Sequence, residues 1–208
     1  RLSGMNLIID ETDHPLIIKV ASIPTSRLQV YFIDNDDYFS RRQMEADENG
    51  VEYADNGERA IFYARGVLET VKKLRWAPDI IVCQGWMVPL YIKTAYKDEP
   101  SFAKTKVVTS LFTNRLKNDL GKHFKRSVEF RGAKASLLKG YGDTFDFLEL
   151  GKMAIDYSDG LVEAGKDVNA QLLAHAESRG LPVLRYPGED FADAYADYFN
   201  QLIPDAGE

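Results

Sequence analysis

The sequence predicts an α/β protein in which a mostly parallel sheet is flanked by helices. Three observations support this class. Short apolar runs rich in β-branched residues are separated by polar, proline-containing stretches, which is typical of strands. Other segments repeat apolar residues at helical spacing. From about residue 56 onward the two kinds of segment alternate, as they do in βαβ units.

Three strands are expected at the beginning of the chain, at residues 5–9, 16–21 and 28–33, most simply as a meander. His14 stands before a proline between the first two runs, and we expect it to be a solvated turn residue. Residues 34–57 are polar and rich in acids. Their spacing lacks the alternating ligands and the closing glutamate of a calcium loop, so a solvated loop is favoured over a metal loop.

A long helix follows this loop. Asp55 or Asn56 is expected to cap its N-terminus, and Glu58 stands three residues after Asp55, as in a capping box. Apolar residues recur on one face, and Pro78 ends the helix. The apolar face consists of Ile61, Ala64, Leu68 and Val71.

The remainder of the chain alternates between strands and helices. Residues 114–141 interrupt it with eight cations against two acids, and a mobile insertion is favoured there over a surface for phosphate or an anionic partner. Asp167 is expected to cap the helix at 168–179, and Gly180 to end it. The expected strands are 79–83, 104–111, 160–163 and 181–184, and the expected helices are 88–96, 145–157, 168–179 and a last one through Phe191, Tyr195, Tyr198 and Leu202.

Composition excludes several classes of protein. The 208 residues carry 26 basic and 32 acidic side chains, a net charge of −6, which argues against a general nucleic-acid binder. No apolar run approaches the ~18 residues of a membrane span. A single cysteine, Cys83, excludes an internal disulfide framework and a cysteine-built zinc site, and its place in an apolar strand predicts a buried, inert thiol. A reducing, cytoplasmic setting with no membrane partner is therefore expected.

Ligands of open α/β sheets bind outside the carboxyl ends of the strands. This rule selects residues 84–87, 110–114 and 163–166. At the first of these, Gln84 and Trp86 offer an amide and an aromatic platform, which suits a carbohydrate. The alternative, that Trp86 anchors the helix that follows, is equally compatible with the sequence. The three histidines lie in unrelated contexts, so a histidine metal site has little support, and His175 is expected on a helix surface.

Six motifs are distinctive: VYFIDN at 30–35, YADNGER at 53–59, PDIIVCQGW at 78–86, PLYIK at 89–93, KVVT at 106–109 and MAIDYSDG at 153–160. In their order and spacing they resemble the N-terminal domain of bacterial glycogen synthases and plant starch synthases, in particular the short glycogen synthase-like proteins of Bacteroidetes-type bacteria. The resemblance covers residues 28–112 and 145–183.

The resemblance implies a single Rossmann-like domain over residues 1–208, like the N-terminal half of a GT-B glycosyltransferase. The family transfers glucose from ADP-glucose to an α-1,4-glucan without a cofactor or metal. The resemblance implies substrate-binding roles for five residues, and no catalytic residue is assigned. The five are Gln84, Trp86, Asp55, Asn56 and Arg59. The partners implied are glycogen or another α-glucan and a second glycosyltransferase domain or chain.

The sequence also departs from the family. The family strand end His-Cys-His-Asp-Trp-His reads VCQGWM at 82–87, so Gln84, Gly85 and Met87 replace two histidines and an aspartate. The family's Thr-Ile-His-Asn is TSLF at 109–112. The chain begins with Arg1, and we expect a truncated N-terminus and no second Rossmann domain. Two interpretations remain: a synthase domain inactive as this chain alone, or a non-catalytic glucan-binding or regulatory relative that acts as an interaction module.

Overall fold

A computed structural model describes residues 2–113 and 116–203. It confirms the α/β class and the parallel sheet with flanking helices. The elements run in this order: β1 (Leu2–Ile9), β2 (Thr12–Ser22), β3 (Gln29–Asp34), α1 (Asp36–Phe39), α2 (Asn56–Lys73), β4 (Ile80–Cys83), α3 (Met87–Lys93), β5 (Lys106–Leu111), α4 (Phe124–Ser127), α5 (Phe147–Asp156), β6 (Gly160–Glu163), α6 (Ala170–Ser178), β7 (Val183–Leu184) and α7 (Phe191–Leu202).

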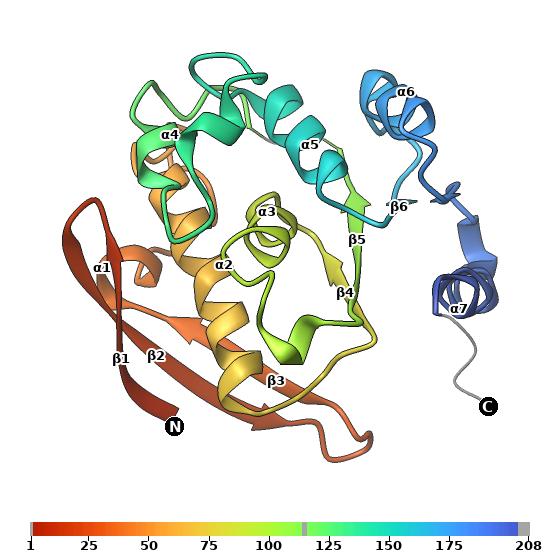
Figure 1. The fold of residues 1–208 in the computed structure, drawn as a ribbon, viewed down its shortest axis with the longest axis horizontal. Helices are drawn as coiled ribbons and strands as arrows, with labels where there is room; N and C mark the ends of the chain where they lie inside the picture. Colours follow the sequence, from red (N-terminus) through yellow and green to blue (C-terminus); the bar gives the residue numbers. More distant parts are fainter. Residues whose placement is uncertain (1, 114–115, 204–208) are drawn as a thin grey trace.

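The strands form two sheets (Figure 1). β1, β2 and β3 make the expected antiparallel meander. Asp10 and Glu11 turn the chain between β1 and β2 with φ of 48° and 65°, as the two central residues of a type I′ turn require. β4, β5, β6 and β7 pair in parallel in chain order. Their carboxyl ends therefore lie along one edge, which we call the carboxyl edge.

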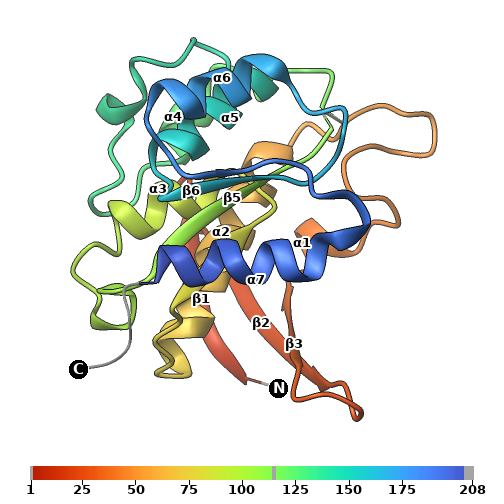
Figure 2. The same cartoon turned by 90° about the vertical axis from the view of Figure 1, so that its right-hand side faces the viewer.

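The parallel sheet is covered on both faces. Successive side chains of a strand point to opposite faces of the sheet. In β5 the successive residues Val107 and Val108 are both fully buried. Val107 belongs to the main core, which also includes residues of α2, α3 and α5, whereas Val108 packs with Tyr198 of α7. Figure 2 shows α7 in front of this second face. α2 lies between the meander and α3, so its apolar face joins the two sheets into one core (Figure 1).

Several local expectations were wrong. His14 is not a solvated turn residue: it is buried, and its Nε2 lies 3.0 Å from the Tyr38 hydroxyl. Asp55 and Glu58 form no capping box, because Asp55 binds Arg41 and Glu58 accepts a hydrogen bond from Tyr38. The loop at 34–57 is not uniformly solvated, since it contains α1 with its buried Tyr38.

Helix termini differ from expectation in a similar way. Asn169, not Asp167, caps α6 through its side-chain oxygen, and Gly180 follows the helix with the expected positive φ of 69°. α5 begins at a capping box that the sequence reading missed, formed by Asp146 and Glu149.

The basic segment 114–141 is an integrated part of the described core rather than a loose insertion. Its residues 114 and 115 lie outside the described residues. Beyond them, Leu116, Phe124, Val128 and Leu138 are buried in the main core. A Cβ on Gly57 would lie 2.8 Å from the Phe124 ring, so the glycine permits this segment to approach the first turn of α2 closely.

Candidate functional site

Gln84 and Trp86 follow β4 at the carboxyl edge. Gln84 is exposed, and its amide is available to a ligand. Trp86 is partly buried and packs edge-on against Phe147 of α5, with ring centroids 6.3 Å apart. It stands immediately before α3. The indole therefore anchors α3 against α5, which is the structural alternative left open by the sequence.

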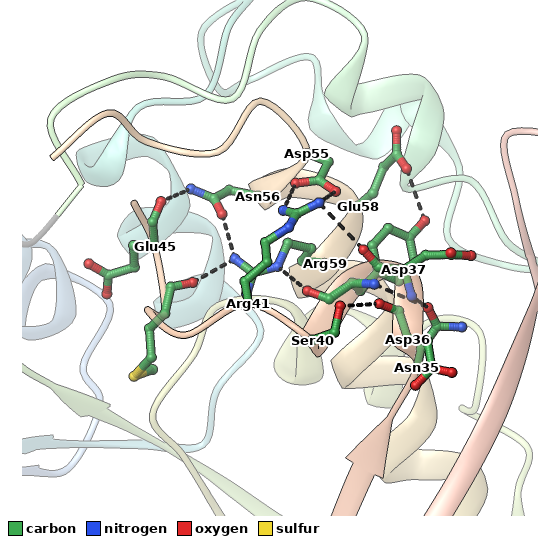
Figure 3. Close-up of polar contacts among 12 residues, drawn as sticks. Asn35, Asp36, Asp37, Ser40, Arg41, Glu45, Asp55, Asn56, Glu58 and Arg59 are labelled. Carbon is green, nitrogen blue, oxygen red and sulfur yellow. Dashed lines mark hydrogen bonds and ion pairs between the residues drawn. The ribbon is translucent and has the colours of Figure 1, made fainter. Parts of the chain in front are cut away.

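Asp55 lies at the entrance of α2 and holds the loop that precedes the helix (Figure 3). Its two carboxylate oxygens accept from the Arg41 guanidinium at 2.5 and 2.7 Å. Burial acts to raise the pKa of Asp55, but the hydrogen bonds and charge of Arg41, aided by Arg59, outweigh burial, and the pKa is lowered. Asp55 is thus a carboxylate already occupied by an internal cation.

Arg59 and Asn56 form the second part of this network. The Arg59 guanidinium donates to Asn56 Oδ1 at 2.7 Å and to the carbonyls of Tyr38 and Met44. Asn56 Nδ2 donates to the Glu45 carbonyl at 2.8 Å. Desolvation by burial lowers the pKa of Arg59, and the nearby Arg41 charge adds to this effect. With its donors directed at the loop, Arg59 serves to position its neighbours.

Both arginines contact the Tyr53 ring. The guanidinium carbons of Arg41 and Arg59 are 4.6 and 5.0 Å from its centroid. Cations over a ring face stabilise its position. The network therefore fixes Tyr53 and Asn56, which both line the hollow described next.

A small polar hollow of about 110 Å³ opens beside the network. Glu52 joins its two walls, since its carboxylate accepts from the backbone N–H of Lys117 and Asn118 at 2.7 and 2.9 Å. We call this polar hollow the first hollow. It is lined by Glu52, Tyr53, Ala54, Asn56, Asn118, Asp119 and Leu120.

The first hollow presents amide and carboxylate groups beside one aromatic ring. These groups suit the hydroxyls and the apolar face of a sugar. Its walls are the loop before α2 and residues 118–120, which belong to the segment that follows β5.

The structure thus brings together Asp55, Asn56 and Arg59 of the predicted set. No hydrogen bond or ion pair within residues 2–113 and 116–203 joins them to Gln84 or Trp86. The sequence reading missed Glu52, Asn118 and Asp119. Asn118 and Asp119 stand just beyond the 110–114 stretch chosen for the end of β5, so a longer window there would have included them.

The other expected candidates have structural roles. Cys83 is buried, and desolvation raises the pKa of its thiol to about 12, so the thiol is unreactive near neutral pH. His175 lies 2.7 Å from Asp156 and ties α6 to α5 rather than standing free on a surface. In the part of the chain that the structure describes, no group of three or more His, Cys, Asp or Glu side chains is placed to hold a metal ion. Among the helices there, none has the length and apolar character needed to cross a bilayer.

The fold and its carboxyl edge define a Rossmann-like α/β domain. Residues 4–182 match the starch synthase catalytic domain family, and the chain belongs to this family. It is a glycosyltransferase-like domain. The fold resembles the N-terminal half of a GT-B glycosyltransferase, as the sequence predicted.

Two similar proteins are glycogen synthases of Chlorobi, in the Bacteroidetes group. That of Chlorobium limicola (strain DSM 245) is 37% identical over 115 residues, 53% of this chain and 24% of the relative. That of Chlorobium chlorochromatii (strain CaD3) is 35% identical over 131 residues, 61% of this chain and 27% of the relative. The matched part spans about a quarter of these relatives.

The fold is similar to that of a solved starch synthase structure. The catalytic domain of starch synthase IV from Arabidopsis thaliana, bound to ADP and acarbose, superposes with a TM-score of 0.60 and 15% sequence identity. The superposition covers 87% of this chain and 38% of that chain.

Proposed function

We propose that this chain is the acceptor-side domain of a glycogen synthase-type glycosyltransferase, which binds an α-1,4-glucan. The family reaction transfers glucose from ADP-glucose to that glucan. The first hollow carries the proposal, because a neutral, hydroxyl-rich ligand requires amides, carboxylates and an aromatic ring, and these line it. The match of residues 4–182 to the starch synthase catalytic domain family supports the same conclusion.

We further propose that the chain alone does not catalyse transfer. A diphosphate leaving group needs cations or metal to stabilise it. Arg41 and Arg59, whose guanidinium groups lie over the Tyr53 ring of the first hollow, are engaged by Asp55, Asn56 and loop carbonyls. Gln84, which replaces a family histidine, carries an amide that cannot transfer a proton at neutral pH. A second glycosyltransferase domain or chain would supply the donor contacts.

Two assays test this function together. Isothermal calorimetry with maltoheptaose measures binding, with cellohexaose as the β-linked control. Incorporation of labelled glucose from ADP-glucose into glycogen measures transfer, with the pure chain and with lysate of the source cells added. We expect maltoheptaose binding and no transfer by the chain alone. Absence of maltoheptaose binding would refute the proposed function.

The departures at the end of β4 favour a second candidate, a non-catalytic glucan-binding or regulatory relative. Gln84, exposed Gly85 and buried Met87 offer no acid or base at the edge where the family has histidines and an aspartate. The transfer assay separates the candidates. Transfer that appears only when lysate and this chain are combined, and is lost with Asn56→Ala, supports the synthase domain. Maltoheptaose binding without glucose transfer, both by the pure chain and by the chain with lysate, supports the second candidate.

A further inference from the structure

A second hollow, of about 210 Å³, lies at the other end of the carboxyl edge. Ala164 follows β6 directly, and Tyr186 and Pro187 follow β7. The other wall is the beginning of α7. Most of the lining lies beyond residue 182, where the match to the family ends. The lining residues are Ala164, Tyr186, Pro187, Gly188, Phe191 and Tyr195.

Three aromatic rings dominate this lining. The side chains of Tyr186 and Phe191 are 39% and 60% exposed, so their rings remain open to a ligand. Within the described residues, the hydroxyls of Tyr186 and Tyr195 make no side-chain hydrogen bond. The hollow therefore offers apolar ring faces together with phenolic groups that have hydrogen-bonding capacity to spare.

Among the described residues, no charged side chain lines the hollow. Arg185, next to Tyr186, pairs with Glu163 at 3.6 Å and with Glu177, and the Glu163 carboxylate also accepts from the Tyr186 backbone N–H. Two acids, Glu189 and Asp190, stand between the lining residues Gly188 and Phe191, and their charge disfavours an anionic ligand. A phosphate or carboxylate ligand would find no free cation on these walls. The chemistry matches a neutral ligand with both apolar faces and hydroxyls, which is the character of a pyranose chain.

We propose that the second hollow is a glucan-binding subsite separate from the first hollow. It holds a sugar unit of a neutral α-glucan by stacking on Tyr186 and Phe191. This proposal rests on the proposed function for the identity of the glucan. A polymer held at the second hollow would stay attached to the domain, which increases its local concentration at the first hollow.

The test measures maltoheptaose affinity by isothermal calorimetry for Tyr186→Ala, Phe191→Ala and the double variant. We expect about a tenfold weaker affinity for each lost ring, as expected for ~1.4 kcal/mol of stacking. Tyr186→Phe keeps the ring and should retain most of the affinity. The matched control is Trp76→Ala, which removes an aromatic side chain of 57% exposure that lines neither hollow and should change nothing. Circular dichroism checks the fold of each variant.

The outcomes separate the two proposals. If wild-type protein binds maltoheptaose and the double variant binds equally well, the second subsite is refuted and the proposed function stands. If the double variant instead alters only the oligomeric state in light scattering, the hollow is a protein interface and the subsite is likewise refuted. If Asn56→Ala removes the transfer seen when this chain and lysate are combined, while maltoheptaose binding persists and depends on Tyr186, both proposals are supported.

Discussion

The Arg41–Asp55 pair allows a quantitative test of how the loop before α2 is held. The two side chains meet through two hydrogen bonds, with 30% and 27% of each exposed. Solvent-exposed ion pairs contribute 0–1 kcal/mol, whereas paired charge-assisted bonds are stronger. We therefore expect a coupling energy of about 1–2 kcal/mol between the two side chains.

A double-mutant cycle measures this coupling. Arg41→Ala, Asp55→Ala and the double variant are unfolded in urea beside the wild type, and the coupling is the part of the loss that is not additive. The Asp55 pKa is lowered from its ordinary value of 3.8 in the folded state. The stabilisation is therefore fully present above pH 3.8 and is lost as the pH falls through the lowered pKa.

Lys19 and Asp34 provide a matched control. They also form an ion pair, at 2.6 Å, but through a single contact with a lysine that is 59% exposed. Their coupling should be below about 0.5 kcal/mol. If the two cycles gave equal couplings, the claim that Arg41 holds the loop through Asp55 would be incorrect. Arg41→Ala should also weaken maltoheptaose binding, because Tyr53 loses one of its two flanking cations.

Three further predictions concern the core. Gly66→Ala should destabilise the protein by about 1–3 kcal/mol in urea, because its Cβ would lie 2.7 Å from Ile33; Gly140→Ala, with nothing within 4 Å, is the control. Since burial raises the pKa of Cys83 to about 12, its thiol should react with a disulfide reagent at pH 8 only after denaturation, and rapid reaction of native protein would contradict this assignment. Tyr38→Phe should cost about 1–3 kcal/mol, because it leaves the flanking imidazole and carboxylate without their shared partner; a chemical melt unchanged from wild type would contradict that role.

The sequence predicted elements well where local signals decide them. β6 has the expected bounds, and α2 begins within one residue of its expected cap. Prediction failed where a distant residue competes for a side chain. Asp55 is placed correctly for a capping box, but Arg41, 14 residues earlier, takes its carboxylate. His14 is buried because Tyr38, 24 residues later, reaches it. Neither partner follows from local spacing.

Contacts between residues distant in sequence also limited the prediction of the candidate site. Asn56 and Arg59 came from motif resemblance, and the structure places them at or beside the first hollow. Asn118 and Asp119 reach it only because Phe124 and Gly57 hold the chain after β5 against α2. The spacing of apolar residues along the sequence does not predict how the chain after β5 packs against α2. The second hollow was predicted only at its margin: Ala164 lies in the selected stretch 163–166, but the aromatic residues after β7 and at the beginning of α7 were not expected there.

The division of the strands into two sheets has a consequence for the order of assembly. The meander and α2 occupy the first 73 residues and contact one another within that span, so they can form early during synthesis. The parallel sheet needs crossovers and closes only when β7 and α7 have emerged. Contacts such as Ser127 to Asp10, 117 residues apart, then join the two parts. Pulsed hydrogen exchange should therefore protect β2 amides before those of β6.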